Sequence, residues 1–375
     1  MRFFHISDLH IGKQLYSYSL LPDQRAVLHE ITERAKEYHP DAILIAGDVF
    51  DRSIPSGEAY TVLDEFLTEL SDITPRIPVL LIAGNHDSAE RIGCFSEILQ
   101  SAGVYFSPAF NGSTMTATLT DELGEVNFIL LPFVRPSVCA AYSGEDISTY
   151  TEAVRYQLSL AGSDKTKRNV VVAHGYTGKN AENADDEEAG GTGFILPDVF
   201  DGYDYTALGH LHTAHKSGES AWYSGSPVRC SFAGTESEKV VNIVTLGEKG
   251  SALVEKVPLH PMHETRELRG TYDELTSLET RRAVGEGDYI KAVLTDEDDI
   301  PDAVMKLRIV YPNLLLLSYD NKRTRVGDDV ISERLTDSLK PEEVFAELYE
   351  MQNGNAPTDE IMKTVRDMFS EVGET

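Results

Sequence analysis

Five short motifs rich in Asp, His and Asn follow one another in the N-terminal part of the chain. Together they supply carboxylate oxygens, an amide oxygen and imidazole nitrogens, which are donors that proteins use to hold divalent metal ions. Any one of these motifs is a weak signal, but all five in this order indicate a centre that carries two adjacent metal ions. The motifs are Asp8-Leu9-His10, Gly47-Asp48-Val49-Phe50-Asp51, Gly84-Asn85-His86-Asp87, Ala173-His174-Gly175 and Gly209-His210-Leu211-His212.

The chemistry that suits such a centre is the hydrolysis of a phosphodiester. Two cations about 3.5–4 Å apart lower the pKa of a water held between them and stabilise the charge of a phosphoryl group during in-line displacement. One carboxylate must bridge the ions, and we expect Asp48 to do so. The leaving alkoxide needs a proton, and His86 directly follows the expected ligand Asn85. The mixed nitrogen and oxygen donors favour Mn, Fe or Zn over Mg, which prefers oxygen and water.

The elements that must position these motifs are strands that alternate with helices. Apolar runs predict strands, helical spacing of apolar residues predicts helices, and each motif follows a predicted strand. The alternation indicates an α/β domain, with a second sheet packed on the first and catalytic residues on loops at the C-terminal ends of strands. The expected strands are 3–6, 42–46, 78–83, 126–131, 170–173, 205–208 and 240–246, and the expected helices are 24–38 and 58–70.

The sequence pattern changes around residue 263, and we expect three domains: 1–262, 263–335 and 336–375. The middle one is predicted to be a small α+β unit with strands at 289–294 and 314–318 and a helix at 301–309.

The last domain contains two short helical patterns that begin at Pro341 and after Thr358, residues that favour helix starts. Their apolar sides are large for so small an appendage, so an exposed patch would require a partner, and a coiled coil could receive it. The alternative is that these helices only cap their own domain. The candidate partner-binding residues are Val344, Phe345, Leu348, Ile361, Val365 and Phe369.

Composition sets further limits. The net charge is −29, which opposes DNA binding because phosphate affinity comes largely from Lys and Arg, unless bound metals or a partner subunit compensate. Three widely spaced cysteines predict free thiols and not a disulfide framework. The acidic, Gly-rich stretch 178–193 predicts an exposed loop. No apolar run is long enough to span a membrane and the N-terminus lacks the pattern of a signal peptide, so we expect an intracellular protein.

The series of motifs resembles the calcineurin-like metallophosphoesterases, which carry a dinuclear centre on a two-sheet β-sandwich flanked by helices. Three segments make the resemblance closer to the SbcD family of bacterial nuclease subunits, and it spans nearly the whole chain. The segment 341–345 is similar to the family's helix-loop-helix, which grips the coiled coil of an ABC-type ATPase, SbcC. The three segments are 8–13, 54–56 and 223–227.

The resemblance implies a ligand set and an activity. One metal would be held by Asp8, His10, Asp48 and His212, and the other by Asp48, Asn85, His174 and His210. His86 would be the catalytic histidine. The implied protein is a manganese-dependent nuclease of the cytoplasm and nucleoid, an exonuclease on double-stranded and an endonuclease on single-stranded DNA. It would act in repair, recombination and replication as a homodimer, while its partner uses ATP. The apolar stretch 15–21 is either a dimer interface or core.

Two acidic residues beside the motifs have no fixed role. The archaeal and eukaryotic form of the family has a histidine where this chain has Asp51, and Asp51 is either a partner of a ligand histidine or a turn residue. Asp87 likewise has no assigned role. Two other functions also stay open: a small-molecule phosphoesterase, which the acidity favours, and a non-enzymatic adaptor for the ATPase, which every retained metal ligand opposes.

Overall fold

The computed structural model describes residues 1–177, 193–232, 237–285, 287–322, 324, 345–346, 349–350, 356–358, 361–366 and 368. The chain divides into two compact units, Met1–Glu264 and Thr265–Thr375. The boundary expected after residue 262 lies two residues before this division. The boundary expected after residue 335 lies outside the described residues.

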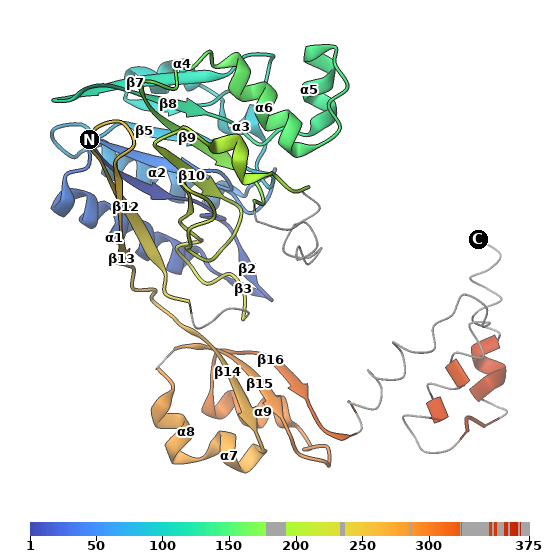
Figure 1. Cartoon of the computed structure of the whole chain (residues 1–375). Helices are drawn as coiled ribbons and strands as arrows, with labels where there is room; N and C mark the ends of the chain where they lie inside the picture. Colours follow the sequence, from blue (N-terminus) through green and yellow to red (C-terminus); the bar gives the residue numbers. More distant parts are fainter. Residues whose placement is uncertain are drawn as a thin grey trace. The chain divides into compact units, whose positions relative to one another are not determined.

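Two sheets form the centre of the first unit (Figure 1). In each, four neighbouring strands run parallel; the six-stranded sheet continues at one end into a pair of antiparallel strands, and the five-stranded sheet into one antiparallel strand. The six-stranded sheet has the order β13 (Ala252–Pro258), β12 (Val240–Leu246), β1 (Arg2–Ile6), β4 (Ala42–Ala46), β5 (Val79–Ile82) and β6 (Val104–Phe106). The five-stranded sheet has the order β11 (Ala221–Tyr223), β10 (Tyr205–Gly209), β9 (Arg168–His174), β8 (Gly124–Leu130) and β7 (Met115–Asp121).

The main hydrophobic core fills the space between the sheets. It joins Phe3, Leu44 and Leu80 of the first sheet to Phe128 and Val172 of the second. Strand β4 is buried at all five positions, as expected where both faces of a sheet are covered. The predicted two-sheet α/β architecture is therefore confirmed.

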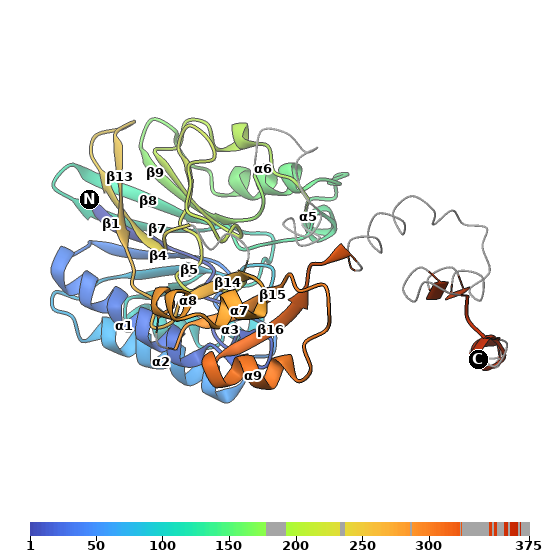
Figure 2. The same cartoon turned by 90° about the horizontal axis from the view of Figure 1, so that it is seen from below.

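Helices cover the outer faces of both sheets. Figure 2 shows α1 (Leu21–Tyr38) and α2 (Gly57–Ser71) on the six-stranded side and α6 (Tyr150–Leu160) on the five-stranded side. Val154 and Leu158 of α6 pack into a core cluster with residues of β8, β9 and β10. Helix α5 (Pro136–Ser143) packs on α6. Short elements complete the unit: β2 (Gln14–Leu15), β3 (Tyr18–Ser19), α3 (Ala89–Ile92), α4 (Ser96–Ser101) and a 3-10 turn at Pro197–Phe200.

The apolar stretch 15–21 forms the β2–β3 hairpin and the first residue of α1. Leu15 and Leu20 are buried, whereas Tyr16 is 53% exposed. Core packing therefore accounts for the two leucines and leaves Tyr16 as the large exposed side chain. The three cysteines are free, as predicted.

The second unit is built on a three-stranded parallel sheet. Leu307 of helix α9 (Ala303–Val310) packs against Ile290 and Leu294 of the central strand, β15 (Tyr289–Leu294). The expected strands and helix of this unit are present, and the strand at 289–294 has the predicted bounds. Its elements are β14 (Thr265–Gly270), α7 (Tyr272–Thr276), α8 (Leu278–Ala283), β15 (Tyr289–Leu294), α9 (Ala303–Val310) and β16 (Leu314–Tyr319).

The predicted helix start at Thr358 is present, because its hydroxyl accepts a hydrogen bond from the Ile361 amide at 3.4 Å. Residues 361–366 are helical and Val365 is buried. Phe345 and Ile361 are half-buried. The other candidate partner-binding residues, Val344, Leu348 and Phe369, lie outside the described residues.

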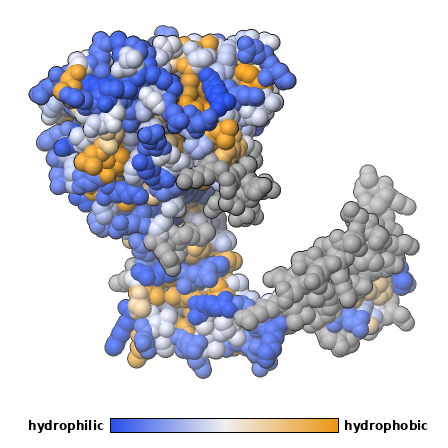
Figure 3. Space-filling view, viewed as in Figure 1, coloured by the Kyte–Doolittle hydropathy of each residue, from blue (hydrophilic) through white to orange (hydrophobic). Residues whose placement is uncertain are grey.

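The visible face of the first unit is mostly hydrophilic with scattered hydrophobic patches (Figure 3), in keeping with a strongly charged chain. Within the part of the chain that the structure describes, no helix is both long and apolar enough to cross a membrane.

Candidate metal centre

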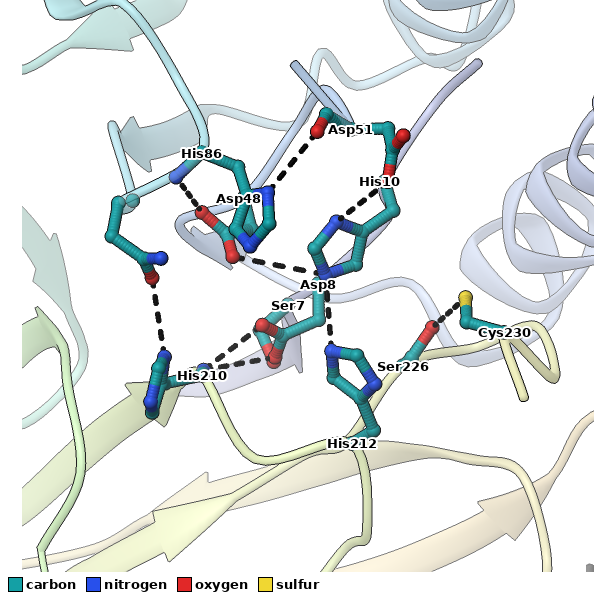
Figure 4. Close-up of polar contacts among 12 residues, drawn as sticks. Ser7, Asp8, His10, Asp48, Asp51, His86, His210, His212, Ser226 and Cys230 are labelled. Carbon is teal, nitrogen blue, oxygen red and sulfur yellow. Dashed lines mark hydrogen bonds and ion pairs between the residues drawn. The ribbon is translucent and has the colours of Figure 1, made fainter. Parts of the chain in front are cut away.

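The seven predicted metal ligands lie together at the C-terminal ends of the central strands. Loops after β1, β4 and β5 of one sheet meet the ends of β9 and β10 of the other, and Figure 4 shows the polar contacts among most of these side chains. Three sets of possible ligand atoms lie within 4.8 Å of one another: Asp8 with His10 and His212, His10 with Asp48 and His86, and Asp8 with Asp48 and His174.

The loops after β1 and β4 run side by side in a constrained backbone conformation. The amides of Asp8 and His10 donate to the carbonyls of Gly47 and Asp48, both at 3.0 Å. Asp8, His10 and Asp48 have φ values of 53°, 43° and 50°, in the left-handed region that non-glycine residues rarely occupy. Such strain collects at functional sites, because only surrounding structure maintains it.

Two glycines allow the loops to approach closely. A Cβ atom added to Gly84 would lie 2.2 Å from Oδ1 of Asp48, and one added to Gly209 would lie 1.9 Å from the carbonyl oxygen of Ala46. Any side chain at either position would displace the metal-ligand candidates or the strand beneath them.

The first group of ligands pairs two histidines from distant parts of the chain. Nε2 of His10 lies 3.0 Å from Nε2 of His212. Burial holds the pKa of His10 well below its usual value and lowers the pKa of His212 to about 4. Both rings are therefore neutral at pH 7 and offer lone pairs to a cation. Asp8 completes this group, and its carboxylate accepts hydrogen bonds from the His210 amide at 2.9 and 3.1 Å.

The second group converges on Asn85. Its Oδ1 lies 2.9 Å from Nε2 of His174 and 3.1 Å from Nδ1 of His210. Nδ1 of His174 donates to the Ala46 carbonyl at 2.8 Å, which leaves Nε2 to face the site. Burial lowers the pKa of His174, but the nearby Asp48 carboxylate outweighs it and raises the value to about 9. The negative charge of Asp48 favours a positive charge at this position, which a metal ion would supply in place of a proton.

Asp48 lies between the two groups. Its Oδ2 is 3.7 Å from Nε2 of His10 and 3.4 Å from Nε2 of His174. Burial raises the pKa of Asp48, yet His174 and His10 reverse that effect and hold it below its usual range. Burial also raises the pKa of Asp8, to about 7. An ionised carboxylate that reaches both histidine groups is what a bridging ligand requires, so the residues present fit two divalent ions.

His86 is exposed, as is the ligand candidate His212, whereas the other ligand candidates are buried or half-buried. Its amide donates to Oδ1 of Asp48 at 2.9 Å, and Nδ1 of its ring lies 3.1 Å from the carbonyl oxygen of Asp51. Its ring meets His10 edge-on, with 5.0 Å between centroids. The exposed His86 imidazole, at the edge of this largely buried cluster, is placed to meet a substrate.

Asp87 and Asp51, the two acidic residues without an assigned role, make different contacts. Asp87 accepts the amides of Val49, Phe50 and Gly84 at 3.0, 2.8 and 2.9 Å, so it joins the loop after β4 to the loop after β5. Burial raises the pKa of Asp87 to about 6. The Asp51 carboxylate lies near Lys13 and His10.

Sequence reasoning missed the residues that hold the ligands in place. The Ser7 hydroxyl donates to Asp8 and lies 2.8 Å from the hydroxyl of Ser224. Lys239 is almost fully buried and donates to the carbonyl of His212 at 3.1 Å. Ser224 belongs to the segment 223–227, whose resemblance to the SbcD family was the available signal. Lys239 is not a metal-ligand type, and nothing in its spacing indicated a role.

Models of two protein families match the chain. One is described as calcineurin-like phosphoesterase and matches residues 1–214, and the other is described as type 5 capsule protein repressor C-terminal domain and matches residues 258–353. Among curated proteins, the SbcD subunit of the nuclease SbcCD of Staphylococcus epidermidis (strain ATCC 12228 / FDA PCI 1200) is 32% identical over 328 residues, which cover 85% of each chain.

Solved structures with detectable similarity are more distant. GAP50, the anchor in the inner membrane complex of Plasmodium, is 12% identical with a TM-score of 0.40, and the match covers 85% of this chain and 96% of that one. A dimetal phosphatase from Danio rerio is 14% identical with a TM-score of 0.36, and the match covers 68% and 98%.

Proposed function

Because the chain belongs to the calcineurin-like phosphoesterases, and within them to the SbcD nuclease subunits, we propose that it cleaves DNA with two bound metal ions as the partner of an ABC-type ATPase. The observation that carries this proposal is the position of Asp48, whose carboxylate reaches both histidine groups. The curated relative is named a nuclease subunit of SbcCD, which favours DNA as the substrate.

The residues divide the work of hydrolysis. When bound, the ions supply an activated water and neutralise charge on the phosphoryl group. Asp8, His10, Asp48 and His212 would hold one ion, and Asp48, Asn85, His174 and His210 the other.

His86 would donate a proton to the leaving oxygen. Its Nδ1–H donates to the Asp51 carbonyl, so the second ring nitrogen can take up and release a proton. The exposure of this ring allows it to touch a bound strand.

The finer properties are proposed on the resemblance to the SbcD family. We propose manganese as the activating metal, exonuclease activity on double-stranded DNA and endonuclease activity on single-stranded DNA. The chain would work as a homodimer in the cytoplasm, at the nucleoid, in repair, recombination and replication. The terminal helices predicted to begin at Pro341 and after Thr358 would bind the SbcC coiled coil, and SbcC would use the ATP. A basic partner surface would also offset the net charge of −29.

The second candidate function is hydrolysis of a small-molecule phosphodiester, which the acidic composition favours. Metal analysis of the purified chain, followed by nuclease assays with manganese and with and without the ATPase, separates the two. We expect about two ions per chain and cleavage of DNA. Hydrolysis of bis-p-nitrophenyl phosphate without any cleavage of DNA, even with the ATPase present, would support the small-molecule function. A chain that binds no metal would refute both.

A further inference from the structure

A cavity of about 360 Å³ opens beside the candidate metal ligands. It includes Asn85, whose amide oxygen lies 2.9 Å from Nε2 of His174, so the cavity shares a wall with the second ligand group. The cavity therefore borders the place where the candidate metal centre would hold a phosphodiester. Its other prominent lining residues are Ser88, Phe110, Phe133, Arg135 and Val138.

Two aromatic rings of the lining are fixed in place by neighbouring rings. Phe133 is half-buried and stacks on Tyr150, with centroids 5.6 Å apart, and its amide donates to the Ala83 carbonyl at 2.9 Å. Phe110 is half-buried and meets Tyr142 edge-on at 5.4 Å. Rigid, partly exposed aromatic rings suit a flat aromatic ligand, because little side-chain entropy is lost when it binds.

The lining also offers one unused positive charge. Its two carboxylates are occupied: Asp87 accepts three backbone amides, and Glu90 accepts the Ser88 hydroxyl at 2.9 Å. Arg135 is exposed at the start of α5, and no side chain of the described residues pairs with its guanidinium. In a chain of net charge −29, an unpaired guanidinium beside a metal centre is a site where a phosphate would be attracted.

We propose that this cavity binds the base of one unpaired nucleotide next to the cleaved phosphate, with Phe133 and Phe110 contacting the base and Arg135 a neighbouring phosphate. Aromatic rings combined with a cation are the general means by which proteins hold single-stranded nucleic acid without reading its sequence. The volume is near the lower limit for small-ligand sites and suits one nucleotide, not a base pair. This inference rests on the proposed function and adds that the strand end must be unpaired before it is cut.

The first test measures binding without cleavage. Single-stranded DNA that carries 2-aminopurine next to the expected cleavage position is titrated with the manganese-loaded chain in a His86→Ser background. Stacking on Phe133 should quench the fluorescence. Phe133→Leu keeps an apolar side chain but removes the aromatic ring, so it should abolish most of the quenching and weaken binding about tenfold. Phe95→Leu changes an aromatic residue that is 70% exposed and outside the cavity, and it should match the parent.

The second test compares cleavage of two strands, one intact and one with an abasic site at the nucleotide beside the cut. The chain with native His86 should cleave the intact strand at least about tenfold faster at low substrate concentration, and Phe133→Leu should bring the two rates together. Arg135→Gln should weaken binding of both strands alike and reduce the dependence of affinity on salt by about one phosphate contact. Arg91→Gln removes a nearby positive charge outside the cavity and serves as its control.

The outcomes separate this inference from the proposed function. Cleavage of intact and abasic strands at equal rates, or a rate ratio that Phe133→Leu leaves unchanged, would overturn the inference while the nuclease function stands. No cleavage of either strand by the metal-loaded chain, alone or with the ATPase, would overturn the proposed function itself. If the 2-aminopurine fluorescence did not change when the strand bound, the proposed binding of a base in the cavity would also be refuted.

Discussion

The backbone carbonyl oxygen of Asp51, and not its carboxylate, faces Nδ1 of His86 at a distance of 3.1 Å. A carbonyl can only accept, so this contact places the proton on Nδ1 and leaves the second ring nitrogen for the reaction. The Asp51 carboxylate points to other residues: its Oδ1 lies 2.9 Å from Nζ of Lys13 and 3.7 Å from Nδ1 of His10. The side chain of residue 51 therefore lies beside the candidate metal ligand His10, while its backbone carbonyl contacts His86.

Replacing His86 by Ser should separate catalysis from metal binding. Because we assign His86 to proton transfer, cleavage of DNA should fall by about 10²–10⁴-fold. The variant should still bind as many metal ions as the parent, as measured by elemental analysis. Possible ligand atoms of His86, His10 and Asp48 also lie within 4.8 Å of one another, so these three side chains could hold one ion. Loss of one ion per chain in the variant would make His86 a ligand instead, and undiminished cleavage would refute both roles.

Asp51→Asn should weaken metal binding more than it slows the cleavage of DNA. The substitution removes the negative charge near His10 and leaves the Lys13 ammonium unopposed beside the cation site. We expect metal affinity to fall by about 10–100-fold, as is typical when a residue that supports a ligand is lost. Calorimetric titration with manganese measures this, and cleavage at saturating metal should fall far less than in His86→Ser.

A double-mutant cycle provides the control for Asp51. If the unpaired ammonium causes the loss, Lys13→Met in the Asp51→Asn background should restore part of the metal affinity. Additive losses in the double variant would show that the carboxylate acts on His10 without Lys13. An affinity equal to that of the parent in Asp51→Asn would reduce Asp51 to a turn residue.

Gly84→Ala should displace Asp48, the proposed bridging ligand. Its new Cβ would lie 2.2 Å from Oδ1 and 2.4 Å from the amide nitrogen of Asp48, closer than any real contact. The loop or the carboxylate must move, at a cost of about 1–3 kcal/mol in the free energy of unfolding. Urea unfolding and metal titration should both show losses.

Gly57→Ala is the matched control for Gly84→Ala. A Cβ at Gly57 meets nothing within 4 Å, and the residue begins helix α2. Alanine there should leave stability unchanged or raise it by up to about 1 kcal/mol, because alanine favours the helix. Equal stability and metal affinity in both variants would contradict the close approach at Gly84.

The sequence predicted strands best where both faces of the sheet are covered. Strand β4 has the expected bounds because burial on both sides produces an unbroken apolar run. Strand β7 was missed, since its residues are mostly exposed or half-buried and it includes four polar side chains in its seven residues, Met115–Asp121. Strand β14 was missed for the same reason: only Thr265 of its six residues is buried. Exposed strands have few apolar residues to reveal them in the sequence, and whether they form depends on pairing with neighbouring strands in the fold.

The candidate ligands could be predicted because each is of a metal-binding type and follows a strand. The residues that support them could not. Lys239 and Ser224 touch the ligand loops only because the chain returns to the site through β11 and β12, and neither type signals a metal centre. The backbone contact of Asp51 with His86 was likewise beyond a pattern of side-chain types.

His5 should make the stability of the metal-free protein depend on pH. It is fully buried between the Tyr205 hydroxyl at 2.9 Å and the Leu208 carbonyl at 3.2 Å, and burial lowers its pKa from 6.5 to about 3. Between these values the unfolded chain binds a proton that the folded chain does not, so stability falls as pH drops from 6.5 towards 3. The slope is at most about 1.4 kcal/mol per pH unit for this one group.

Urea unfolding of the chelator-treated protein at several pH values between about 4 and 7 tests the role of His5. His5→Gln removes the titrating group, so stability should fall less steeply with decreasing pH than in the parent, by up to about 1.4 kcal/mol per unit. Tyr205→Phe removes one hydrogen bond and keeps the imidazole, so it should lower stability by about 1 kcal/mol to a similar extent at every pH. If His5→Gln kept the full slope, the acid sensitivity would belong to other groups, and the neutral, buried state of His5 would be refuted.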